Sequence, residues 1–312
     1  MTLDPKLKPV IEGFAALFKE PPHTRPHLEY RETAARVAAQ TKPVVPAGLV
    51  VEDMVAEANG RRVPVRFYRP AGASGQQPTL MYMHGGGWVI DSVAAHDQTC
   101  MWIAAETPCT VVSVEYGLAP ENPHPAPLLD CEAVTQWLLG NAAKLGVDPA
   151  NLAVSGTSAG ATLAAALCLK YRDQGGAMPF RLQVLLYPPM DVDFERPSYR
   201  QNSEGPILYT DLMKWFWQHY LQKPFDQADH LAVPIRAKNL KGLPPAYVAT
   251  AEYDPLRDEA AHYAARLVEA GINVEYRMAQ GQIHGFVRMR NVTQAAAAEF
   301  DALRAALQRA FA

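Results

Sequence analysis

The chain has 312 residues, and 49% of them are hydrophobic, so it can form one large domain with a substantial core and is not expected to be disordered. Its 29 basic and 32 acidic residues leave a net charge of −3 at pH 7. This balance gives no electrostatic reason to expect a nucleic acid or a membrane surface as partner, and we expect a small, largely uncharged ligand.

The first 45 residues predict two helices. Asp4-Pro5 is typical of a helix start, and apolar residues recur at helical spacing from Leu7 to Phe18, before Pro21-Pro22 ends the pattern. A second, weaker helix is predicted over about Leu28 to Ala39. We expect this leading segment to cover the rest of the molecule and not to join its sheet.

The same N-terminal stretch bears on localisation. It lacks the uninterrupted apolar region and the cleavage site of a secretory signal, and no run of about 18 apolar residues occurs anywhere. We therefore expect a cytoplasmic protein with no membrane insertion. The four cysteines have no C-x-x-C spacing and lie in apolar segments, so we interpret them as small core residues.

From Leu49 the chain predicts a sheet. Two strands, Leu49 to Ala58 and Arg62 to Tyr68, are joined by Asn59-Gly60, a typical hairpin turn. Strands and helices then alternate, which predicts a mostly parallel sheet with helices on both faces. The further strands are Thr79 to Met83, Thr110 to Val114, Leu152 to Ser155, Leu182 to Tyr187, Ala246 to Ala251 and Val274 to Met278. The helices are about Ala95 to Glu106, Leu128 to Lys144, one after residue 158, Pro255 to Ala270, and one from about Gln294.

Residues 191–234 interrupt this alternation. They include a helical patch from Asp211 to Leu221 and are too many for a simple connection. We interpret them as an insertion that joins the N-terminal helices in a cap. Its aromatic residues are expected mostly to form the cap's own core, with a minority facing a ligand: Phe194, Tyr199, Tyr209, Trp215, Phe216, Trp217, Tyr220 and Phe225. The predicted division is 1–45 for the cap helices, 191–234 for the cap insertion, and 46–190 and 235–312 for the two parts of the catalytic α/β domain.

A candidate nucleophile lies where the predicted strand Leu152 to Ser155 runs into a helix. The sequence Gly156-Thr157-Ser158-Ala159-Gly160 has the G-x-S-x-G spacing of a sharp strand-to-helix turn, in which small flanking residues allow the serine hydroxyl to be exposed. The helix that follows begins with free N–H groups and a positive dipole end, which favour an anionic intermediate. Ser158 is therefore the predicted nucleophile.

A glycine triplet follows the predicted strand Thr79 to Met83. Because glycines leave backbone N–H groups uncovered, a turn here can direct two of them at one spot and form an oxyanion hole. We expect Gly86 and Gly87 to be donors, Gly85 to shape the turn, and Ala159 to supply a third N–H. A phosphate-binding loop is the alternative, but neither G-x-G-x-x-G nor G-K-[ST] is present.

A serine nucleophile needs a base and an orienting carboxylate, which in this kind of fold follow it in the order acid, then histidine. Only His262 and His284 follow the plausible acid. His262 lies within a predicted helix, whereas His284 lies in a loop just after the strand Val274 to Met278, where it can reach Ser158. His284 is the predicted base.

The acid is expected at the end of the strand Ala246 to Ala251. Asp254 fits, although an Asp before Pro is equally typical of a helix N-cap. Asp258, one turn further on, is a weaker candidate, and Glu252 stays open on sequence grounds.

The chain resembles a known family through five motifs. In order, they are HGGGW, YGLAPE (Tyr116 to Glu121), GTSAG, DPLRDE (Asp254 to Glu259) and IHGF (Ile283 to Phe286). From about Leu49 to the C-terminus it resembles the bacterial hormone-sensitive lipase family of α/β-hydrolases, in the subgroup with GTSAG. The resemblance implies an α/β-hydrolase fold with a helical cap.

The resemblance also implies a function. It suggests a carboxylesterase with Ser158, Asp254 and His284 as its triad, a small apolar ester as substrate, and short or medium acyl chains. No cofactor and no metal are expected, and a homodimer along the last edge strand is compatible with the family. An amidase or peptidase using the same triad, and a small-molecule receptor on this scaffold, are the alternatives.

Two positions depart from the family pattern. Gly117 replaces an arginine that is usual in the YRLAPE form of the second motif, and Asn122-Pro123-His124-Pro125 replaces a plainer sequence. Neither touches the expected triad, so they bear on local packing and substrate preference.

Overall fold

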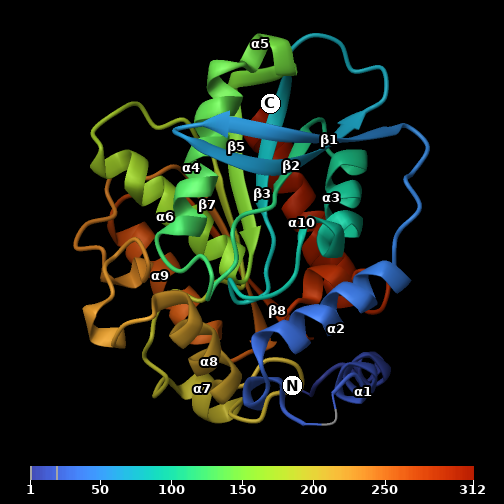
Figure 1. Cartoon of the computed structure of the whole chain (residues 1–312), viewed down its shortest axis with the longest axis vertical. Coiled ribbons are helices and arrows are strands. Elements are labelled where there is room, and N and C mark those ends of the chain that lie inside the picture. Colours follow the sequence, from blue (N-terminus) through green and yellow to red (C-terminus); the bar gives the residue numbers. More distant parts are fainter. Residues whose placement is uncertain (1, 19) are drawn as a thin grey trace.

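An eight-stranded sheet forms the centre of the molecule in the computed structural model, which describes residues 2–18 and 20–312 (Figure 1). The strand order is β1-β2-β4-β3-β5-β6-β7-β8. Pairs β1/β2 and β2/β4 are antiparallel and all other pairs are parallel. The strands are β1 (Leu49–Ala58), β2 (Arg61–Pro70), β3 (Gln77–Met83), β4 (Thr110–Val114), β5 (Val147–Thr157), β6 (Gln183–Leu186), β7 (Ala246–Tyr253) and β8 (Val274–Ile283). The predicted mostly parallel sheet is confirmed.

The hairpin at the start of the sheet forms as its sequence predicts. Ala58 pairs with Arg61, so Asn59 and Gly60 make a two-residue turn. Their φ angles are 52° and 71°, and two successive positive φ angles are what a type I′ hairpin turn requires.

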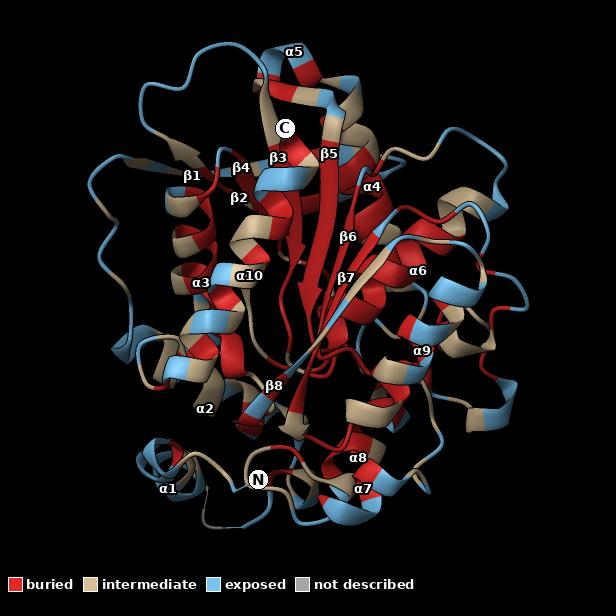
Figure 2. Ribbon diagram, turned by 180° about the vertical axis from the view of Figure 1, so that it is seen from behind, coloured by how far each residue is buried: buried red, intermediate tan, exposed pale blue. Residues whose placement is uncertain are grey.

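Helices cover both faces of the sheet, and successive side chains of a strand point alternately to one face and to the other. Leu80 and Tyr82 of β3 pack in the core with α3 (Val93–Glu106) and α10 (Gln294–Phe311). Met81 and Met83 point to the opposite core, with α4 (Ala126–Gly140), α6 (Ala159–Asp173) and α9 (Arg257–Glu269). Figure 2 shows the resulting continuous buried centre, in which β3 is buried from Thr79 onward and β5 from Leu152 onward.

A separate group of helices lies at the end of the sheet to which the parallel strands point, at the bottom of Figure 1. It contains α1 (Lys8–Ala16), α2 (His27–Gln40), α7 (Pro197–Gln201) and α8 (Thr210–Leu221). The N-terminal segment contacts residues 191–234, since the imidazole Nδ1 of His23 lies 2.9 Å from the Tyr209 hydroxyl and the Tyr30 ring packs against Trp215. The division of the chain into cap and α/β parts stays a prediction.

Some boundaries differ from those expected. β8 continues to Ile283 and does not end at Met278, because Ile283 still pairs with Tyr253 after an irregularity in the register. The helix expected up to Lys144 is split into α4 and α5 (Ala142–Leu145), and α7 was not predicted. Short 3₁₀ helices complete the chain: η1 (Pro5–Leu7), η2 (Pro22–Thr24), η3 (Phe225–Gln227), η4 (Pro234–Arg236) and η5 (Phe286–Met289).

All four cysteines are buried and free, as expected for small core residues. Within residues 2–18 and 20–312, no helix has both the length and the apolar character that crossing a membrane requires.

Candidate active site

Ser158 lies on a strained turn between β5 and α6. Its φ and ψ are 51° and −126°, a backbone conformation that residues other than glycine rarely adopt. The turn is tight: a Cβ on Gly156 would lie 2.2 Å from the carbonyl of Gly160, and one on Gly160 would lie 2.2 Å from the Met83 oxygen. The Ser158 N–H donates to Leu186 O at 2.8 Å, which fixes the turn to β6. Both flanking glycines are therefore required by close contacts.

His284 follows β8 directly and meets this serine. Its Nε2 lies 3.0 Å from Ser158 Oγ across 126 residues of sequence. The ring of Tyr187, the residue after β6, packs edge-on against the imidazole at 4.8 Å. The longer β8 therefore places His284 at the end of a strand, where its backbone is held by the sheet.

Asp254 lies beyond the histidine and is fully buried. Its Oδ2 is 2.7 Å from His284 Nδ1, and its Oδ1 accepts the Leu256 N–H at 2.9 Å. The helix α9 begins at Arg257 with Leu256 as its N-cap, so the predicted helix is present but begins later than expected from Pro255. Asp254 is therefore not the N-cap of this helix, although its Oδ1 binds the backbone of the turn that leads into it.

The other candidates are engaged elsewhere. Glu252 accepts the Gly281 N–H at 2.7 Å and so holds the chain ahead of His284. Asp258 accepts the Ser198 N–H at 2.8 Å, at the start of α7. His262 lies on α9 with its Nδ1 3.4 Å from a guanidinium nitrogen of Arg196. Geometry thus favours Asp254 and His284 as the partners of Ser158.

The glycine triplet forms a turn beside the serine. Gly86 and Gly87 have φ angles of 99° and 58°, and Gly86 O accepts the N–H groups of Val89 and Ile90 at 3.0 and 2.9 Å. A Cβ on Gly85 would lie 3.4 Å from Ser158 Cβ, so the turn and the serine are adjacent. Within the described part of the chain, the N–H groups of Gly86, Gly87 and Ala159 donate to no backbone carbonyl. Their role as oxyanion donors stays a prediction.

A buried polar network supports this turn from behind. The fully buried His84 donates its Nδ1–H to Gly85 O at 2.8 Å, and its ring stacks on Tyr116 at 4.2 Å. The Tyr116 hydroxyl donates to His84 O at 2.8 Å. Burial lowers the pKa of His84, because an imidazolium loses its hydration there, and this favours the neutral ring.

Helix α8 also packs against this turn. Phe216 lies so close to Gly87 that a Cβ on this glycine would be 2.2 Å from the ring. The next ring, Trp88, stacks on Tyr220 at 4.3 Å and contacts Trp217 at 4.4 Å. The aromatic residues of segment 191–234 therefore pack mainly on one another and on the turn.

The two departures from the family pattern lie together. A Cβ on Gly117 would lie 2.9 Å from the Asn122 side chain, so Asn122 occupies the space beside this glycine. The Gly117 N–H donates to Asp130 at 2.9 Å, and Arg61 of β2 pairs with the same carboxylate at 2.6 Å. The local packing is thus complete without a side chain at position 117.

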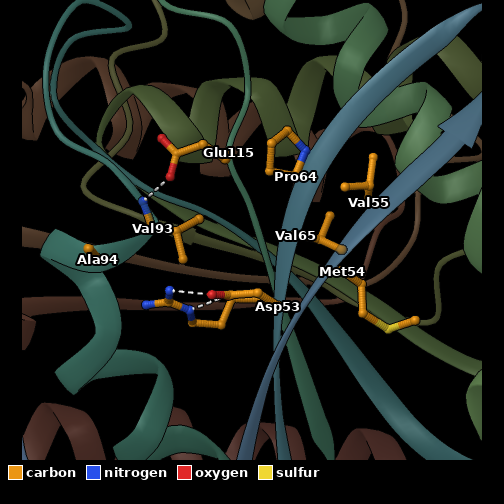
Figure 3. Close-up of a pocket in the computed structure, with 9 residues that line it drawn as sticks. Asp53, Met54, Val55, Pro64, Val65, Val93, Ala94 and Glu115 are labelled. Carbon is orange, nitrogen blue, oxygen red and sulfur yellow. Dashed lines mark hydrogen bonds and ion pairs between the residues drawn. The ribbon is translucent and has the colours of Figure 1, made fainter.

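A cavity of about 510 Å³ lies elsewhere, between the β1–β2 hairpin and the start of α3 (Figure 3). Glu115 in its wall accepts the Val93 N–H at 2.9 Å, and Asp53 pairs with Arg66 at 2.6 Å. None of its lining residues belongs to the serine site. We assign no part of the chemistry to this cavity.

The arrangement at Ser158 suits proton transfer. A buried carboxylate beside Nδ1–H selects the imidazole tautomer whose Nε2 can accept the serine proton, which is the requirement for a nucleophilic hydroxyl. Among the described residues, no three His, Cys, Asp or Glu side chains are grouped as a metal site. Two contacts of the site carried no local sequence signal: Tyr187 against His284, and Arg31 of α2, which donates to Val89 O at 2.6 Å.

Comparisons with known proteins identify the relatives of this chain. Residues 80–288 match a family model described as the alpha/beta hydrolase fold. Carboxylesterase NlhH of Mycobacterium tuberculosis is 36% identical over 312 residues, covering 99% of this chain and 96% of its own. Ethyl acetate hydrolase of Pseudomonas putida is 35% identical over 245 residues, 76% of each chain. An ester hydrolase from the metagenome of Lake Arreo, solved with a bipyridine phosphonate derivative, superposes with a TM-score of 0.92 at 36% identity, covering 99% of both chains.

Proposed function

The chain belongs to the α/β-hydrolase family that contains the hormone-sensitive lipase-like esterases, and from this premise we propose that it is a serine carboxylesterase with Ser158, His284 and Asp254 as its triad. One observation carries the proposal. Ser158 Oγ, the His284 imidazole and the Asp254 carboxylate form a continuous series of hydrogen bonds of 3.0 and 2.7 Å. This is the relationship that nucleophilic serine catalysis requires.

In the proposed first step, His284 Nε2 takes the Ser158 proton as Oγ attacks the ester carbonyl carbon. The N–H groups of Gly86, Gly87 and Ala159 stabilise the developing oxyanion, with Gly85 shaping their turn. The bond to the alcohol oxygen then breaks, the alcohol leaves with the proton from His284, and an acyl-enzyme remains. Asp254 stays ionised and holds the imidazole throughout.

The second step returns the enzyme to its starting state. A water molecule gives one proton to His284 while its oxygen attacks the acyl carbon. The bond to Ser158 Oγ breaks, the serine regains its proton from His284, and the carboxylic acid leaves. No cofactor enters this cycle.

We propose a small apolar ester with a short or medium acyl chain as the substrate. Phe216 packs directly on Gly87, which limits the space over the oxyanion turn. One relative is named an ethyl acetate hydrolase, and that name fits a short acyl chain. The cap of residues 1–45 and 191–234 over parts 46–190 and 235–312, and a cytoplasmic location, remain proposals from the sequence.

A homodimer along β8 is also proposed. β8 is the last strand of the sheet, and its Tyr276 and Met278 side chains are exposed. An edge strand of this kind can pair with a second copy. Sedimentation analysis of the purified protein tests this part independently of activity.

The decisive experiment compares the wild type with Ser158→Ala on p-nitrophenyl esters from acetate to palmitate, beside matched anilides. We expect the wild type to hydrolyse the short esters best, and Ser158→Ala to lose roughly 10³-fold or more in kcat while still folding. An organophosphonate should label Ser158 in the wild type only. His262→Ala is the matched histidine control and should keep wild-type turnover. Full esterase activity in Ser158→Ala, or a preference for anilides, would overturn the proposal.

A further inference from the structure

We infer that Arg31, on helix α2, is a positioning residue that holds the oxyanion turn in its working shape. This inference rests on the proposed esterase function and assigns to the N-terminal helices a role beyond covering the substrate. Arg31 lies 127 positions before Ser158 in the sequence, so its influence on the site passes through the turn.

The guanidinium of Arg31 binds two backbone carbonyls at once. Its Nε donates to Val89 O and its Nη2 donates to Ala119 O, each at 2.6 Å. Nη1 and Nη2 also form a two-point pair with the carboxylate of Glu121, at 2.8 and 2.7 Å. The side chain is 22% exposed, so most of it is enclosed by these contacts. All three nitrogens of the group are therefore engaged.

Both carbonyls belong to segments that are tied to the oxyanion turn. Val89 N donates to Gly86 O at 3.0 Å, which closes the turn that presents the Gly86 and Gly87 N–H groups. Ala119 N donates to Trp88 O at 2.8 Å. Val89 and Ala119 are fully buried. The guanidinium thus bridges the residues just after the glycine triplet to the neighbouring Ala119 segment.

This bridge needs an arginine. Its planar group presents donors in fixed directions, whereas a lysine ammonium is a point charge that cannot span two carbonyls and a carboxylate in one plane. A buried carbonyl without a hydrogen-bond donor costs free energy. When Arg31 is removed, the segments of Val89 and Ala119 are therefore expected to shift toward other donors. The Arg31 hydrogen bonds lower the pKa of Glu121 to about 2, so this carboxylate is ionised beside Arg31 at neutral pH.

A loosened turn should affect the chemical step more than substrate binding. The Gly86 and Gly87 N–H groups interact most strongly with the oxyanion, which exists only near the transition state. A displacement of these donors therefore lowers kcat, while KM for a small ester changes little. A purely structural contact would lower the thermal stability without this separation of kcat from KM.

The test uses the full chain, p-nitrophenyl acetate as substrate, and two variants on one helix. Arg31→Ala should lower kcat about tenfold or more, a fraction of the effect of deleting an oxyanion donor, with KM within about threefold of the wild type. Arg36→Ala is the matched control, because Arg36 is exposed on the same helix; it should keep wild-type kcat. Guanidinium chloride, far below denaturing concentrations, should restore part of the lost kcat in Arg31→Ala, and equal sodium chloride should not.

Each other outcome has a defined meaning. A folded Arg31→Ala with wild-type kcat, a change confined to KM, or no rescue by guanidinium would overturn the inference. If Arg31→Ala does not fold, Arg31→Lys decides, since it keeps the positive charge beside Glu121 and should still lose kcat; wild-type kcat in Arg31→Lys would overturn the inference. Failure of the esterase proposal is recognised separately, because Ser158→Ala would then retain turnover.

Discussion

Asp254 binds His284 with one carboxylate oxygen and the backbone of Leu256 with the other. The distances are 2.7 Å from Oδ2 to His284 Nδ1 and 2.9 Å from Oδ1 to Leu256 N. The second bond prevents the carboxylate from rotating away from the imidazole. The turn that leads into α9 therefore orients the histidine through this one side chain.

Asp254→Asn tests this relationship. The amide oxygen can still accept the Leu256 N–H, so the turn should remain intact, but the amide N–H₂ cannot accept the Nδ1 proton of His284. We expect kcat to fall about 10⁴-fold with little change in the melting temperature, because the wrong imidazole tautomer is then favoured. Asp258→Asn, in the same motif, should cost activity little. Equal losses in the two variants would remove Asp254 from its proposed role.

Gly87→Ala tests the contact between the oxyanion turn and α8. Its φ of 58° strains any other residue by about 1–2 kcal/mol, and its new methyl group would overlap the Phe216 ring, which adds about 1–3 kcal/mol. Gly271→Ala is the control, since φ is 80° there and a Cβ meets nothing within 4 Å.

We expect urea unfolding to show the larger loss of free energy for Gly87→Ala, with a strong decrease in kcat. Gly271→Ala should show the backbone strain alone and keep its activity. Equal free energies of unfolding in the two variants would show that the Phe216 ring can move aside without loss of stability.

Glu259→Gln tests a buried acid that the proposed mechanism does not use. Glu259 is fully buried and accepts the Met190 N–H at 3.0 Å. Burial first, and then the nearby Asp191 and Asp254 carboxylates, raise its pKa well above the ordinary value, against the opposing charge of Arg196. The folded protein therefore holds this proton more tightly than the unfolded chain does.

The sign of the pH dependence follows from that difference. The stabilising contribution of the proton is complete below the unfolded pKa of about 4.3 and is lost as the pH rises through the folded pKa. Glutamine mimics the protonated form at every pH. The melting temperature of Glu259→Gln minus that of the wild type should therefore increase from pH 5 to pH 8. A difference independent of pH would mean that Glu259 is ionised in the folded protein.

Local sequence was enough to predict the elements that hold the site. The Asn59-Gly60 hairpin and the turn at Ser158 each depend on a few adjacent residues. These residues either adopt a positive φ or leave room for a close backbone contact. β8 was predicted to end at Met278, but it continues to Ile283, past Gly281, which has a φ of 69°. Pairing of Ile283 with Tyr253 carries the strand past this glycine, and that is a tertiary effect.

Arg31 shows the limit of such reasoning. Its acceptors on Val89, Ala119 and Glu121 lie 58, 88 and 90 residues away in sequence. On the helix itself it is one of two arginines, and no spacing distinguishes it from Arg36. Its contacts depend on how α2 lies against two distant loops, which only the folded chain determines. The domain division and the dimer along β8 remain predictions.

Segment 191–234 lies between two strands of the sheet, and this position has a consequence for how such proteins diversify. β6 and β7 are hydrogen-bonded neighbours, from Gln183 beside Ala246 to Leu186 beside Ala249, so the chain leaves and re-enters the sheet at adjacent strands. Insertions or deletions between them alter no strand pairing. Segment 191–234 can therefore change in length and sequence during evolution while the sheet is inherited unchanged. Recombination between relatives has natural crossover points at these two strands.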